Sequence, residues 1–80
     1  MASAKVHKCI QEINEFRRES IRAVNEANEI KDEILATAIR EDYEIIPELV
    51  SKLKANRERR KWLNQAIRYR KQIISEKGQN

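Results

Sequence analysis

The stretch EDYEIIPELV, residues 41–50, decides how this chain folds. Pro47 lacks a backbone N–H and its ring clashes with the preceding turn, so a helix cannot continue through it. The same ring pushes Ile46 away from helical dihedral angles. Proline suits the first position of a helix, where Glu48 complements the helix dipole. We therefore predict one helix that ends near position 41 and a second that begins at Pro47.

The residues that precede this boundary contain neither Gly nor Pro, and small or apolar side chains recur at alternating spacings of three and four. Such spacing predicts a long helix over about residues 3–41 with a coiled-coil-like seam. The seam consists of Val6, Cys9, Ile13, Phe16, Ser20, Ala23, Ala27, Ile30 and Ile34, and Ile10, Val24 and Ala38 widen it. Because serine can cap a helix, a break at Ser20 into two shorter helices is the alternative.

The residues after the boundary predict a second helix over about 47–76, followed by a frayed tail over 77–80. Its inward stripe is Leu49, Val50, Leu53, Asn56, Arg60, Leu63, Ile67, Arg70 and Ile74. A second apolar strip lies beside it and comprises Ala55, Trp62, Ala66, Tyr69 and Ile73. One partner helix cannot cover both strips. We therefore expect an all-α antiparallel hairpin that pairs with a second copy into a four-helix-bundle-like dimer.

Length and composition predict a small, single-domain protein without a membrane span. Its 80 residues form a single helical domain, 1–80, with a thin core. The single cysteine, Cys9, cannot form an internal disulfide, which favours a reducing compartment. The longest largely apolar run, residues 34–39, is far shorter than the ~20 residues of a membrane span, and charged residues interrupt the N-terminal region. These features predict a soluble, cytoplasmic protein.

The side chains that could carry chemistry are few. His7 and Cys9 point to different faces of a helix, so we expect no metal site. The only glycine, Gly78, lies near the C-terminus and cannot build a phosphate-binding loop. No nucleophile stands beside a plausible base, so the sequence predicts no catalytic residues, no cofactor and no enzymatic activity.

Charge divides the chain into an acidic and a basic half. Residues 1–44 hold seven Lys/Arg and ten Asp/Glu, whereas residues 45–80 hold ten and three, giving −3 and +7. We expect the two helices to attract each other along their flanks, with an acidic outward face on the first helix: Glu12, Glu15, Glu19, Glu26, Glu29 and Glu33. An outward basic strip on the second helix comprises Lys54, Arg57, Lys61, Arg68 and Lys71. A cationic row of this kind can follow a phosphate backbone.

Two functions fit this pattern. The first is a non-catalytic interaction or regulatory protein that binds another protein through an aromatic and arginine-rich face, since such side chains dominate interface hot spots. Its candidate residues are Trp62, Tyr69, Ile73, Arg59 and Arg70. Free-standing helical chains of this size are typical of small microbial or phage accessory proteins that inhibit a larger machine. The alternative is binding of RNA or DNA along the basic strip. Glu48 and Glu58 argue against a membrane-surface role.

Overall fold

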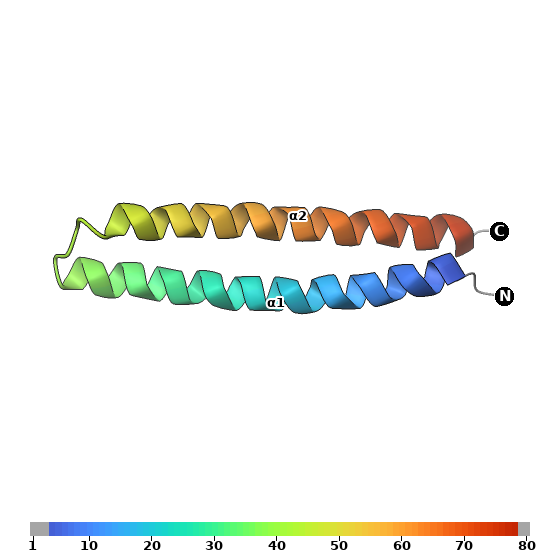
Figure 1. Cartoon of the computed structure of the whole chain (residues 1–80), viewed down its shortest axis with the longest axis horizontal. Coiled ribbons are helices and arrows are strands. Elements are labelled where there is room, and N and C mark those ends of the chain that lie inside the picture. The colour runs from blue at the N-terminus through green and yellow to red at the C-terminus, as the bar shows by residue number, and fades with distance from the viewer. Residues whose placement is uncertain (1–3, 79–80) are drawn as a thin grey trace.

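The computed structural model describes residues 4–78, which form two long antiparallel helices (Figure 1). They are α1, Ala4–Ile39, and α2, Ile46–Gly78. The helices lie side by side along almost their whole length, so the molecule is a bar of 61 × 14 × 14 Å. The prediction of an all-α helical hairpin is confirmed for the described residues.

The helix boundaries differ from those expected by one or two residues. α1 runs unbroken through Ser20, so the three-helix alternative is wrong. The Ser20 hydroxyl is buried without a hydrogen-bond partner among the described residues, which is not the arrangement of a helix cap. α2 begins at Ile46 and includes residues 77–78, which were expected in the frayed tail. Residues 1–3 and 79–80 lie outside the described part.

The turn between the helices is set by Glu41 rather than by Pro47. The backbone of Glu41 has a φ of 65°, in the left-handed region. Its N–H donates to the carbonyl of Ala38 at 3.0 Å, and the N–H of Asp42 donates to the carbonyl of Thr37 at 3.1 Å. This pair of bonds is a Schellman motif, which satisfies carbonyls at a helix end and turns the chain away. α1 therefore ends at Ile39, before the proline could influence it.

The core is a single seam between the two helices, and it follows the stripes expected from the sequence. The buried apolar side chains are Cys9, Ile13, Ala23, Ala27, Ile30, Leu49 and Leu63. Thr37 is also buried; it continues the α1 stripe by one further step of three. Midway along the seam, the Asn56 Nδ2 donates to the carbonyl of Ala23 at 2.9 Å, and its Oδ1 accepts from Arg60 at 2.7 Å. The small alanine side chain permits this close approach, and both polar atoms of the buried amide are paired.

The left-handed residue at the turn generates a prediction. Because a β-carbon is strained at positive φ, Glu41→Gly should raise the free energy of unfolding by about 1 kcal/mol. Urea unfolding followed by circular dichroism measures this change. Glu44→Gly is the matched control: it alters the same residue type in the same turn, where φ is not positive, and should not stabilise the chain. Equal effects of the two substitutions would refute the strain argument.

Candidate interaction faces

Each helix carries two exposed or half-exposed rows of side chains, one on each flank of its buried stripe. All four rows follow spacings of three, four, seven or eleven, which keep their members on one side of a helix. On α1, the acidic row is Glu12, Glu15, Glu19, Glu26, Glu29 and Glu33, and the apolar row is Ile10, Ile21, Val24, Leu35 and Ile39. On α2, the aromatic row is Arg59, Trp62, Ala66, Tyr69 and Ile73, and the basic row is Lys54, Arg57, Lys61, Arg68 and Lys71.

The acidic row of α1 lies on the same side of the hairpin as the aromatic row of α2. Glu12 contacts Arg70, and Glu19 lies 3.8 Å from Arg59. Glu12 also lines a surface hollow of about 290 Å³ together with Tyr69 and Ile73. We call this side the acidic-aromatic face.

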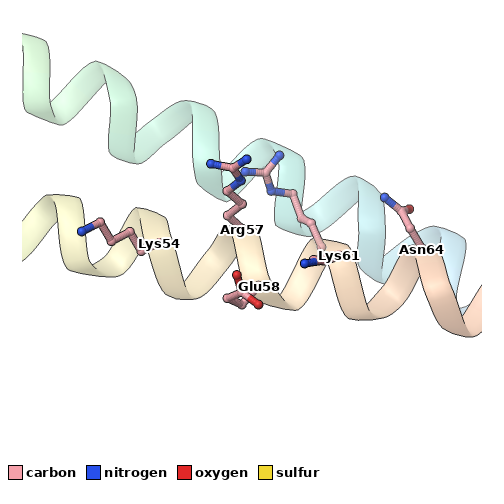
Figure 2. A pocket seen from close by; sticks show the side chains of 6 residues that line it. Lys54, Arg57, Glu58, Lys61 and Asn64 are labelled. Atoms are coloured by element: carbon pink, nitrogen blue, oxygen red, sulfur yellow. The ribbon is translucent and has the colours of Figure 1, made fainter.

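The apolar row of α1 lies on the opposite side, beside the basic row of α2. Lys31, which falls between Val24 and Leu35 in the spacing of the apolar row, lines a hollow of about 330 Å³ with Lys54 and Arg57. A neighbouring hollow of about 680 Å³ follows the basic row, and Figure 2 shows its side chains along α2: Lys54, Arg57, Glu58, Lys61 and Asn64. We call this side the basic-apolar face.

The expected attraction between the acidic and basic helices is present on one flank only, where Glu12 and Glu19 pair with Arg70 and Arg59. Among the side chains of residues 4–76, the only ion pairs that join α1 to α2 are those of Glu12 and Glu19. No member of the basic row forms an ion pair there. The two charged rows lie on opposite sides of the hairpin, so the basic row and the acids other than Glu12 and Glu19 keep their charge available for other molecules.

Arg70 is the most constrained cation of the acidic-aromatic face. Its Nε and Nη2 donate to the same Oε2 of Glu12 at 2.9 and 2.8 Å, and its Nη1 donates to the carbonyl of Ala66 at 3.1 Å. Its guanidinium carbon lies 4.6 Å from the ring centroid of Phe16. The side chain is 22% exposed. Arg70 is one of the candidate interface residues, and in the structure these contacts fasten α2 to α1.

The other candidate interface residues remain accessible. Trp62 is 57% exposed, and its ring packs perpendicular to that of Phe16, with centroids 5.7 Å apart and an interplanar angle of 89°. Tyr69 is 63% exposed, Arg59 is exposed, and Ile73 is half-buried. Trp62 is therefore held in position by the core while most of its surface faces solvent.

The apolar row of α1 was missed as a surface in its own right. Ile10 and Val24 were assigned to the edge of the buried seam, yet the structure exposes them along with Ile21, Leu35 and Ile39. Leu35 is 63% exposed and Ile39 is 74% exposed. The sequence does contain the pattern that identifies this row: its large apolar residues are separated by three, four or eleven positions, which keeps their side chains on one side of a helix.

Other chemistry finds little support in the described part of the chain. Residues 4–78 hold no group of three or more His, Cys, Asp or Glu side chains that could bind a metal ion. Neither described helix is long and apolar enough to cross a membrane. His7 is exposed and Cys9 is buried.

Comparison with known proteins gives no information on the function of the chain. No family model, curated protein or solved structure matches the chain. Its function must therefore be inferred from the two faces themselves.

The contacts of Arg70 predict that lysine cannot replace it. A lysine ammonium cannot donate from two nitrogens to Glu12 while stacking on Phe16, so Arg70→Lys should lower the free energy of unfolding by about 1–2 kcal/mol. Arg68→Lys, the same change at an exposed site, should alter it by less than about 0.5 kcal/mol. Both values are measurable by urea unfolding. A similar loss in the two variants would contradict the fastening role of Arg70.

Proposed function

We propose that the chain is a non-catalytic interaction protein, a stiff helical hairpin that binds protein surfaces through its acidic-aromatic face. The observation that carries this proposal is the placement of Trp62 and Tyr69. Both are more than half exposed, although burial of aromatic side chains is strongly favourable. Two large aromatic groups in one row of a small domain are typical of a binding site.

Preorganisation of the face supports the same proposal. The Trp62 ring rests on Phe16, and Arg70 beside it is fixed by Glu12. A partner that binds there would therefore pay little conformational entropy to order these side chains. Exposed Arg59, at 3.8 Å from Glu19, extends the row with a cation that a partner can contact.

This proposal is tested by capture of proteins from the source cells on the immobilised chain. Wild-type protein and the Gln65→Ala variant, altered at an exposed site outside the row, should retain the same protein. The Trp62→Ala/Tyr69→Ala variant should bind it at least about thirtyfold more weakly, since hot-spot losses of about 2 kcal/mol are common.

The sequence contains one tryptophan, so its fluorescence reports on this face alone. Addition of the captured protein in purified form should shift the Trp62 emission to shorter wavelength as the ring leaves water. Retention that is indifferent to Trp62→Ala/Tyr69→Ala, or binding without a change in emission, would contradict the proposal.

Nucleic-acid binding is the second candidate, and the basic row favours it. Its five cations are exposed and form no ion pair with the side chains of residues 4–76, and they follow one side of α2. From Lys54 to Lys71 the row spans about 26 Å of helix, enough to follow several phosphates.

A gel-shift assay with mixed DNA and RNA at 50 and 200 mM salt tests this candidate. Binding should be present at low salt and should fall by about tenfold or more at the higher concentration. Arg57→Ala/Lys61→Ala should weaken it, whereas Arg18→Ala/Arg22→Ala, which removes two exposed cations from α1, should have a smaller effect. Absence of binding at low salt eliminates nucleic acid as the target.

A further inference from the structure

We propose that the acidic-aromatic face binds the basic-apolar face of a second copy of this chain. This inference rests on the proposed function, because it names the partner of the same face. It also gives the unpartnered apolar row of α1 an occupant. The four-helix-bundle-like dimer expected from the sequence would be closed, whereas this contact joins two different faces.

The two faces complement each other when the second copy lies on the first and is rotated by 180° about the axis perpendicular to the contacting faces. Without this turn, each helix would lie over its own equivalent, and the acidic row would meet the apolar row. With the turn, α1 lies over α2 of the second copy. The apolar row then meets the aromatic row, and the basic row meets the acidic row.

The spacing of the charged residues fits this arrangement along the whole interface. Lys54, Arg57, Lys61, Arg68 and Lys71 follow one another at steps of three, four, seven and three. Glu12, Glu15, Glu19, Glu26 and Glu29 follow the same steps, 42 residues earlier. Parallel alignment of the two helices at this offset therefore brings every member of the basic row level with an acid.

The same offset aligns the apolar side chains. After the 180° rotation, α1 of each copy lies over α2 of the other copy. Both of these helix pairs have the same offset in residue number, because α1 and α2 run antiparallel within each copy. Trp62 is then level with position 20 of α1 in the second copy, which places this ring beside Ile21 of that copy. Ala66 is level with Val24 of the second copy. One alignment thus satisfies the charges and the apolar rows together.

The acids and bases that would pair are available in the single chain. Glu15, Glu26 and Glu29 form no ion pair with the side chains described over residues 4–76, nor do their counterparts Arg57, Arg68 and Lys71. All six residues are exposed. Glu12 and Glu19 already contact arginines of α2, so the new pairs depend mainly on the other acids.

Pairings of like faces satisfy the charges less well. Two acidic-aromatic faces would bring acid against acid, or acid against the aromatic row. Two basic-apolar faces would bring base against base, or bury bases against Ile21 and Leu35. Unpaired charges against apolar surface are costly. Only the contact between unlike faces gives each row a suitable partner.

The area is also sufficient. A side of the bar measures 61 by 14 Å between Cα atoms, roughly 850 Å², and a standard protein interface buries about 800 Å² on each partner. A contact between unlike faces leaves one binding face free on each copy, so such contacts build open stacks. We therefore expect assemblies that grow beyond a dimer.

Nucleic acid and lipid are weaker occupants of the basic-apolar face. Phosphates would pair with the basic row but leave the apolar row, about 44 Å long from Ile10 to Ile39, in water. A bilayer could cover both rows, yet Trp62 and Tyr69, the residue types that favour membrane interfaces, lie on the opposite face.

Two variants that each disable one face provide the test. Glu15→Arg/Glu26→Arg reverses the charge of the acidic row, and Ile21→Asp/Leu35→Asp makes the apolar row acidic. All four sites are exposed, so the fold should persist, as circular dichroism will verify. By sedimentation velocity, wild-type protein should grow in mass with concentration beyond two chains, whereas each variant alone should associate at least about tenfold more weakly.

An equal mixture of the two variants should form a complex of two chains and nothing larger, because each supplies the intact face that the other lacks. The control Asn25→Asp/Ala36→Asp adds the same charge at exposed sites on the edge of α1 that points away from α2, and should assemble like the wild-type protein. A wild-type chain that stays monomeric at millimolar concentration would overturn the self-pairing, as would a mixture that forms no complex.

The register has its own test. Glu26→Arg and Arg68→Glu should each weaken assembly, and their combination in one chain should restore it, because residue 26 of one copy then again faces an opposite charge at residue 68 of the next. Absence of rescue would refute the offset of 42. A monomeric wild-type chain that still captures another protein through Trp62 would overturn self-pairing but retain the proposed function, so the two failures are distinguishable.

Discussion

Two helices can cover only one stripe of each other's surface, and this limit governs the molecule. α1 and α2 bury a single seam, centred on small alanines of α1 and on Leu63 and Asn56 of α2. Every other apolar side chain must lie on a flank, in contact with water. The exposed Trp62, Tyr69 and Leu35 are therefore consequences of a two-helix architecture with more apolar surface than one seam can hold.

The properties of the two faces depend on which row of α1 lies beside which row of α2. Glu12 and Glu19 hold the acidic side of α1 against the aromatic side of α2, through Arg70 and Arg59. This leaves the basic row of α2 beside the apolar row of α1. Each face thus combines one charged row with one apolar row, and the two combinations are opposite. A bar with two unlike, complementary sides is suited to binding by contact along its length.

Much of the fold could be predicted from the sequence, because helical spacing is a local property. Pro47 excludes a continuous helix, and the steps of three and four identify both buried stripes. The residues of the aromatic and basic rows could also be found in this way. The left-handed turn that ends α1 could not, since it is made by Glu41 at a position where glycine is the usual signal.

The sequence by itself determined two helices, their buried stripes and the membership of most rows. Tertiary structure alone decided which row of α1 faces the same way as which row of α2. The rotation of one helix about its axis relative to the other depends on how both stripes pack together, around Ala23 and Asn56 and through the contacts of Arg70. That rotation separated the charged rows, fixed Arg70 internally, and exposed the apolar row of α1 as a surface.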